Sequence, residues 1–61
     1  MDYEVTRGGY GLIYNYKSHA TEFYDEISDA FIGDVKGKTP FEIEEMSEGD
    51  FQLMLEDNYI S

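Results

Sequence analysis

Apolar and polar side chains alternate along the N-terminal part of the chain, which is the pattern of half-buried β-strands. The alternation breaks at a Gly-Gly pair at positions 8 and 9, which favours a two-residue hairpin turn because both turn positions need φ > 0. A turn centred there places Val5 opposite Leu12 and Tyr3 opposite Tyr14, with all four side chains on one face. The pattern therefore predicts an antiparallel hairpin.

The next segment carries apolar residues at helical spacing. These residues fall on one stripe of a helix: Ala20, Phe23, Ile27, Ala30 and Phe31. Ser18 is a candidate N-cap, and Gly33 suits the left-handed conformation in which helices commonly end. The spacing predicts a helix over residues 18–32.

Two shorter helices with clear start signals are predicted in the last third of the chain. The first begins at Thr39-Pro40-Phe41-Glu42, where a Thr cap, a Pro at the first helical position and a Glu at the third form a capping box. Ser47 is the candidate cap of the second helix, which is predicted to run to about Asn58. Their apolar residues are expected to face the core: Ile43, Met46, Phe51, Met54 and Leu55.

These elements predict a single α+β domain over residues 1–61, with the 2–17 hairpin packed on one longer helix and two short ones. A third strand from residues 34–36 or 59–60 would extend the hairpin to a three-stranded antiparallel sheet. The chain has no cysteine, so no disulfide stabilises it. Six Tyr and four Phe supply the buried area instead.

The excess of acidic residues bears on function rather than on fold. Fourteen acidic residues against four Lys and Arg give a formal net charge of −10 on 61 residues, far more than a small domain needs for solubility. Self-repulsion works against compactness, so this excess indicates a positively charged partner. Phosphates and anionic lipids carry the same sign as the protein, which argues against direct binding to nucleic acid or membranes.

Four carboxylates form the sharpest candidate site, because the predicted 18–32 helix would place them on one stripe: Glu22, Asp25, Glu26 and Asp29. Neighbouring turns of a helix lie about 5–6 Å apart, a spacing of the same order as successive phosphates. A solvated face usually mixes signs, since like charges at i,i+4 cost a few tenths of a kcal/mol each. A stripe without a basic residue therefore favours a role in binding.

The C-terminal part extends the acidic bias, with seven acids and no Lys or Arg from residue 39 onward. Glu42 and Asp50 also suit the positive ends of helix dipoles. Five acids lack that explanation: Glu44, Glu45, Glu48, Glu56 and Asp57. Four of them form the second candidate edge: Glu44, Glu45, Glu48 and Asp57. Leu53 projects between acids and is a candidate anchor, although single exposed leucines are also normal.

The sequence offers no catalytic or metal-binding set. His19 is the only histidine, and without cysteine there is neither a thiol nucleophile nor a thiolate ligand. The Gly-rich turn lacks the Lys-Ser/Thr of a phosphate loop. After Asp34, Lys36 and Lys38 occupy positions where a calcium loop needs acids. We therefore expect no enzyme activity, no metal and no cofactor.

In its short length, strong acidity, many aromatics and carboxylate stripes, the chain resembles small acidic proteins that bacteriophages direct against host nucleic-acid enzymes. These include DNA-mimic anti-restriction proteins, uracil-DNA glycosylase inhibitors and anti-CRISPR proteins. The resemblance implies a viral protein for evading host defence, one that occupies a DNA- or RNA-binding groove stoichiometrically without turning anything over.

We accordingly expect a non-catalytic inhibitor that binds the basic groove of a defence or DNA-processing effector, in the cytoplasm of a bacterial host, as a monomer or homodimer. No stretch is long and apolar enough for a membrane span, and the acidic N-terminus is unlike a signal peptide. Two alternatives stay open. One is an acidic adaptor or virion accessory protein that binds a basic partner without excluding nucleic acid. The other is a small homo-oligomeric structural protein with aromatic contacts.

Overall fold

A computed structural model, which describes residues 2–60, has an α+β fold with one antiparallel sheet and two helices. The strands follow the chain in the order β1 (Val5–Arg7), β2 (Tyr10–Asn15), β3 (Ala20–Asp25) and β4 (Phe31–Lys36). Helices α1 (Pro40–Glu45) and α2 (Glu48–Asp57) come after the sheet. The predicted α+β class is confirmed. The predicted count of strands and helices is wrong, because the sheet has four strands and only two helices follow it.

The β1–β2 hairpin confirms the predicted turn and register. Val5 pairs with Leu12, and Gly8 and Gly9 have φ of 60° and 85°, which glycine adopts without a Cβ penalty. The predicted pairing of Tyr3 with Tyr14 is wrong. Tyr3 precedes β1, and its ring lies over Gly11 on the opposite face of the sheet, where a Cβ on Gly11 would come within 2.4 Å of the ring.

The predicted helix over 18–32 is also wrong, since this segment forms most of a second hairpin. β3 pairs with β2 on one side and β4 on the other. Thr21 and Phe23 are fully buried and alternate with the more exposed Glu22, as in a strand. Aromatic and β-branched residues at these positions favour a sheet, and pairing on both sides satisfies the backbone.

The turn between β3 and β4 has its own polar cap. The Oδ1 of Asp25 accepts hydrogen bonds from the backbone amides of Ile27 and Ser28, at 2.9 and 3.0 Å. Asp29 has a φ of 62°, which short polar side chains tolerate better than most. Gly33, expected as a helix stop, lies within β4, and Ile60 packs against it. The chain therefore reverses direction where helical spacing had predicted continuation.

The two C-terminal helices begin where the sequence predicts. Thr39 accepts a hydrogen bond from the amide of Glu42, and Ser47 accepts one from the amide of Asp50, both at 3.2 Å. The predicted third strand at 34–36 is part of β4. The alternative strand at 59–60 does not form; Tyr59 has a φ of 58°.

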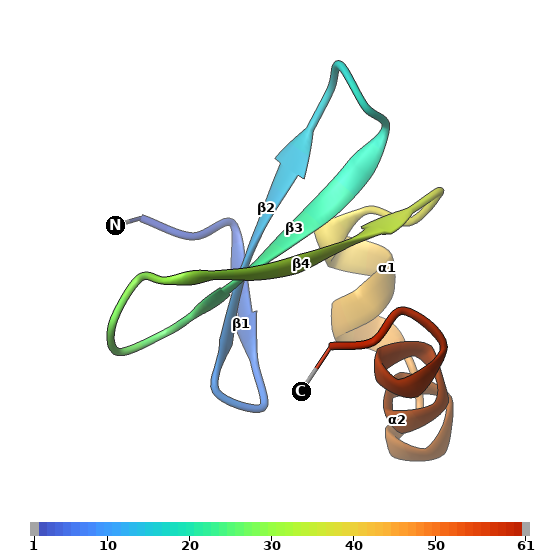
Figure 1. The fold of residues 1–61 in the computed structure, drawn as a ribbon. Coiled ribbons are helices and arrows are strands. Elements are labelled where there is room, and N and C mark those ends of the chain that lie inside the picture. The colour runs from blue at the N-terminus through green and yellow to red at the C-terminus, as the bar shows by residue number, and fades with distance from the viewer. Residues whose placement is uncertain (1, 61) are drawn as a thin grey trace.

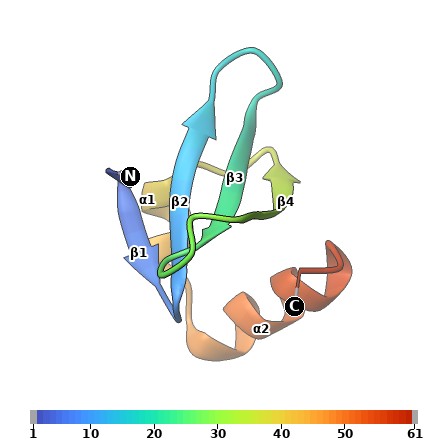
Figure 2. The ribbon, with the colours of Figure 1, turned by 60° about the vertical axis from the view of Figure 1, so that its left-hand side comes forward.

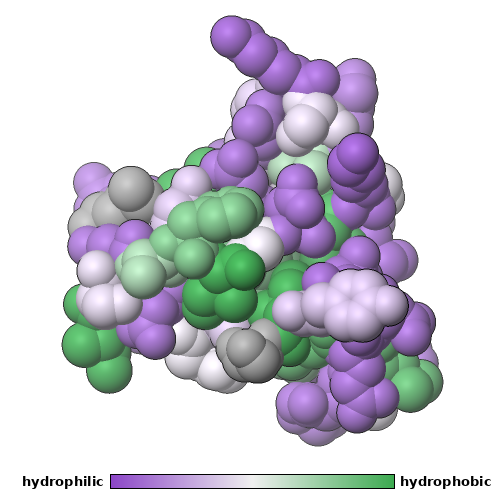
Figure 3. Space-filling view, in the orientation of Figure 1, coloured by the Kyte–Doolittle hydropathy of each residue, from purple (hydrophilic) through white to green (hydrophobic). Residues whose placement is uncertain are grey.

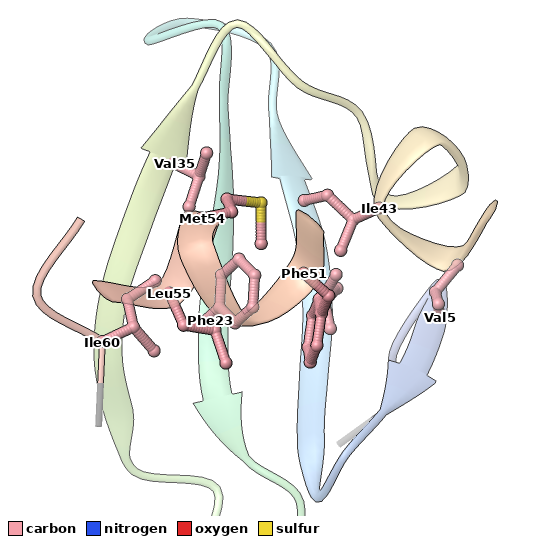
Figure 4. Close-up of a cluster of buried hydrophobic side chains, with 9 residues drawn as sticks. Val5, Phe23, Val35, Ile43, Phe51, Met54, Leu55 and Ile60 are labelled. Atoms are coloured by element: carbon pink, nitrogen blue, oxygen red, sulfur yellow. The ribbon is translucent and has the colours of Figure 1, made fainter. Parts of the chain in front are cut away.

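Both helices cover the same face of the sheet, as the two ribbon views show (Figures 1 and 2). Their apolar sides meet the sheet in one core (Figure 4). The buried cluster consists of Val5, Leu12, Phe23, Val35, Ile43, Phe51, Met54, Leu55 and Ile60. The other face of the sheet carries no helix and is called the open face below.

Arg7 joins β1 to both helices. Its Nη1 donates to the carbonyl oxygens of Ile43 and Glu44, at 2.6 and 3.3 Å, and its Nη2 lies 3.5 Å from a carboxylate oxygen of Glu48. The guanidinium carbon lies 4.3 Å from the centre of the Phe51 ring. The last turn of α1 has no basic residue of its own, so Arg7 supplies the positive charge that a helix C-terminus favours.

Candidate functional site

The two helices form an acidic outer layer, called the helix layer below. Its carboxylates are all exposed: Glu42, Glu44, Glu45, Glu48, Asp50, Glu56 and Asp57. This layer contains the second predicted edge, namely Glu44, Glu45, Glu48 and Asp57, together with Leu53. The structure thus brings these five predicted site residues onto one layer.

Core packing fixes which side chains the helix layer presents. In α1, Pro40 and Ile43 are buried, which turns Glu44 and Glu45 outward. In α2, the buried residues are Phe51, Met54 and Leu55, so the opposite side of the helix points to solvent. Leu53 lies on that side, and 58% of its surface is exposed.

A second exposed apolar residue was not predicted. Phe41, in the first turn of α1, leaves 60% of its surface exposed, although aromatic side chains usually bury most of theirs. It shares an α1 face with Glu44 and Glu45, at i+3 and i+4. The helix layer therefore combines seven carboxylates with two apolar side chains that project from it. Phe41 carried no distinctive sequence signal, because the Pro-Phe-Glu start predicts the helix without saying which side faces the core.

Neither helix of the helix layer contains a Lys or Arg, although Lys38 directly precedes Thr39, the N-cap of α1. Arg7 reaches the helix layer from beneath and is only 18% exposed. The three lysines and the histidine lie together at one end of the sheet, at Lys17, His19, Lys36 and Lys38. The pairing of Asn15 with Ala20, and of Ala20 with Lys36, places these residues at the same end, as does the hydrogen bond from the Gly37 amide to the His19 carbonyl. The molecule is therefore electrically asymmetric.

The first predicted site, the stripe of Glu22, Asp25, Glu26 and Asp29, does not exist as a helical stripe because the segment is a β-hairpin. Glu22 lies on the open face and accepts hydrogen bonds from the side chains of Tyr24 and Asn15, at 2.8 and 3.1 Å. Asp25 caps the β3–β4 turn, and Asp29 accepts a hydrogen bond from the hydroxyl of Tyr3. Three of the four carboxylates thus have local structural roles, and Glu26 is exposed on the turn.

These contacts shift the ionisation of the groups involved. The amides of Ser28 and Ile27 hold the pKa of Asp25 below its usual value of 3.8. The hydroxyl of Tyr3 lowers the pKa of Asp29, and the same hydrogen bond raises the pKa of Tyr3 from 10.0 to about 12. The bond to Glu22 likewise raises the pKa of Tyr24. Asp25 and Asp29 remain ionised at neutral pH, and their carboxylates accept hydrogen bonds from within the protein.

The open face carries an aromatic row that the sequence pattern did not predict. The ring centres of Tyr3 and Tyr24 are 6.1 Å apart, and those of Tyr24 and Phe31 are 5.5 Å apart. Phe31 is 58% exposed, and Ile27 on the adjoining turn is 95% exposed. In Figure 3, groups of apolar side chains are exposed over β4 and the turn before it, with polar side chains between them. This apolar surface is a second region available to a partner.

A pocket of about 390 Å³ lies between the β1–β2 and β3–β4 turns. Its lining consists of Gly8, Gly9, Tyr10, Asp25, Glu26, Ile27 and Ile32. Two carboxylates border it, but Asp25 already accepts two backbone hydrogen bonds. Within residues 2–60, no group of three His, Asp or Glu side chains is arranged to hold a metal ion.

Comparison with family models, with curated proteins and with solved structures found no match to this chain. In the part of the chain that the structure describes, neither helix has the length and apolar character needed to cross a membrane.

Proposed function

We propose that the protein is a non-catalytic inhibitor that places its helix layer in the basic groove of a nucleic-acid-binding effector and blocks DNA binding. The observation that carries this proposal is that the two helices expose many carboxylates and contain no Lys or Arg. Seven exposed carboxylates lie on the helix layer, while the three lysines lie at one end of the sheet and Arg7 lies beneath the helices. A groove lined with Arg and Lys attracts such a surface as it attracts phosphates. The proposed contact surface is therefore formed by α1 and α2, and not by the 18–32 segment that the sequence had favoured.

The charges and the exposed apolar side chains have different roles in this proposal. Long-range attraction between the helix layer and a basic groove accelerates association and weakens as salt is added. Exposed ion pairs contribute little net affinity, so the charges alone do not make a tight complex. Leu53 and Phe41 supply apolar area that can become fully desolvated within a ring of charged contacts.

A displacement assay tests the proposal. Labelled DNA bound to each of a panel of purified effectors, including CRISPR nucleases, restriction enzymes and DNA glycosylases, is titrated with the protein while fluorescence anisotropy is recorded. We expect the protein to displace DNA from at least one effector, and excess DNA to displace the protein. If effectors bind the protein and DNA simultaneously, the inhibitor proposal is wrong.

Matched variants assign the contact. The triple variant Glu44→Gln, Glu45→Gln, Asp57→Asn removes three charges from the helix layer. The control variant Asp2→Asn, Glu4→Gln, Glu26→Gln removes the same number of exposed charges from residues outside the two helices. We expect the first triple to lose displacement by about tenfold or more and the control to lose much less. Equal losses would show that net charge, rather than the helix layer, governs binding.

One observation favours a second candidate function, an acidic interaction module or virion accessory protein that leaves nucleic acid bound. Ile27 and Phe31 expose apolar surface away from the helix layer, and exposed apolar patches mark protein-binding surfaces. In that case Phe31→Ser and Ile27→Ser would abolish partner binding, whereas the helix-layer triple would leave it intact. The same panel distinguishes the two, because only the inhibitor displaces DNA.

A further inference from the structure

β4 ends the sheet with an unpaired edge. It is the last strand in the order β1-β2-β3-β4, and it pairs only with β3. Among residues 2–60, no backbone hydrogen bond joins Asp34 or Lys36 to any segment outside the sheet. Both residues are exposed, and the C-terminal segment meets β4 at Gly33 instead. An unpaired edge is a template for another strand unless the protein blocks it.

The register shows which backbone groups face outward from this edge. The amide of Gly37 donates to the carbonyl of His19, so residues 19 and 37 form a hydrogen-bonded pair. Hydrogen-bonded and non-hydrogen-bonded pairs alternate along an antiparallel ladder. Thr21–Val35 is therefore a hydrogen-bonded pair, whereas Ala20–Lys36 and Glu22–Asp34 are non-hydrogen-bonded pairs. The N–H and C=O groups of Asp34 and Lys36 therefore point away from β3, toward the side of β4 on which no strand pairs.

Side-chain charge along the same edge is uncompensated. Asp34 lies directly opposite Glu22 on the open face, and like charges in facing positions destabilise a sheet. Tyr24 and Asn15 bond to Glu22, but no ion pair forms at Asp34 within the described residues. Lys36, two residues along, faces the small Ala20. The edge thus presents one anion and one cation at the two positions whose backbone groups face outward.

From this pattern we propose that the protein forms a homodimer through antiparallel pairing of two β4 strands, centred on Val35. In this register Asp34 of each copy faces Lys36 of the other, and these are the residues whose N–H and C=O groups point outward. Two ion pairs and the hydrogen bonds of both facing pairs form together. Each Asp34 then lies between Glu22 of its own chain and a lysine of the second copy.

The geometry of such a dimer places both helix layers on one side. A two-fold axis through the facing Val35 residues stands perpendicular to the sheets, so both sheets keep the same orientation relative to their helices. The two four-stranded sheets become continuous, and the unpaired edge of β4 disappears. The acidic surface doubles in extent without a change in either protomer. None of the helix-layer acids takes part in the pairing. The dimer proposal can therefore be tested separately from the proposed inhibition.

A charge swap tests the dimer. Sedimentation velocity over a range of protein concentrations is run on the unmodified protein and on Asp34→Lys, Lys36→Asp and the double variant. Each single reversal brings like charges together twice across the two-fold axis, so we expect the dimer dissociation constant to rise about tenfold or more. The double variant keeps the net charge of −10 and restores opposite charges, so its dissociation constant should return close to the original.

Mixing the two single variants supplies an independent check. One chain then carries two lysines along its edge and the other two aspartates, so the mixture should form a heterodimer although each variant alone is monomeric. Asp34→Lys places a cation opposite Glu22, so we expect this variant to stay folded. Far-UV circular dichroism checks the fold of each variant. A monomer at every concentration overturns the proposal. So does a dimer that ignores the single reversals, or a double variant that fails to recover.

Discussion

At the scale of single residues, Arg7 connects the sheet to both helices. It donates to two carbonyl oxygens at the end of α1, pairs with Glu48 at the start of α2 and stacks on Phe51. Charge-assisted hydrogen bonds are stronger than neutral ones when partly shielded from water. In a chain with ten excess negative charges, this one cation therefore has a structural role rather than a role at a binding surface.

Replacing Arg7 by Ala should lower the free energy of unfolding by about 2 kcal/mol, because the carbonyl groups and the Phe51 ring lose their partner. Urea unfolding followed by circular dichroism measures this. Lys17→Ala removes the same charge from an exposed turn residue and should change the stability by less than about 0.5 kcal/mol. Equal effects of the two substitutions would mean that net charge, rather than the Arg7 contacts, determines the loss.

Gly11 leaves room for the Tyr3 ring on the open face. In Gly11→Ala the new methyl group would come within 2.4 Å of that ring, so the ring must leave Tyr24 and Asp29. We expect a loss of about 1–2 kcal/mol in urea unfolding. In a Tyr3→Ala background the same substitution should cost much less, since no ring remains to displace.

Gly49→Ala serves as the control for Gly11. Gly49 lies in the first turn of α2 with no atom within 4 Å of a new Cβ, so alanine should stabilise the helix by roughly 0.5–1 kcal/mol. Additive effects of the Gly11 and Tyr3 substitutions would contradict the proposed contact.

At the scale of elements, the sequence predicts best where local chemistry decides the structure. The Gly-Gly turn, the Val5–Leu12 register and the Thr39 and Ser47 caps depend on neighbouring residues, and all are confirmed. The 18–32 segment depends on distant partners instead. Its apolar residues fit a helical stripe, yet its aromatic and β-branched side chains pair with β2 to give a fully buried Phe23.

The β3–β4 turn adds a pH dependence to the sheet. Because the Ser28 and Ile27 amides lower the pKa of Asp25 in the folded state, its ionised form stabilises the fold above the ordinary pKa of 3.8. That contribution is lost as the pH falls through the lowered folded value. Asp25→Ala should therefore be less stable than the unmodified protein at pH 7, with a gap that narrows as the pH falls below about 4.

Guanidinium unfolding at a series of pH values measures the gap, and Glu26→Ala on the same turn is the control. Glu26 is exposed, and its side chain has no hydrogen bond among those in the described structure. A gap for Asp25→Ala that stays constant down to the lowest pH would show that the carboxylate charge does not stabilise the turn.

At the scale of the whole molecule, the distribution of charge carries more information than its amount. The sequence predicts strong acidity and identifies Glu44, Glu45, Glu48, Leu53 and Asp57 as candidates, and the structure brings them together on the helix layer. It could not predict that Glu22, Asp25 and Asp29 bond within the fold, because those bonds depend on the β3 and β4 pairing. Nor could it predict that the lysines gather at one end.

The claim that the helix layer meets a cationic groove is tested most directly by the salt dependence of binding. The dissociation constant for an effector identified by displacement is measured by calorimetry between about 0.05 M and about 0.5 M NaCl. We predict that affinity falls steeply with salt, and that the Glu44, Glu45, Asp57 triple flattens this dependence more than the Asp2, Glu4, Glu26 triple does. Affinity that is indifferent to salt, or equally altered by both triples, would contradict the account.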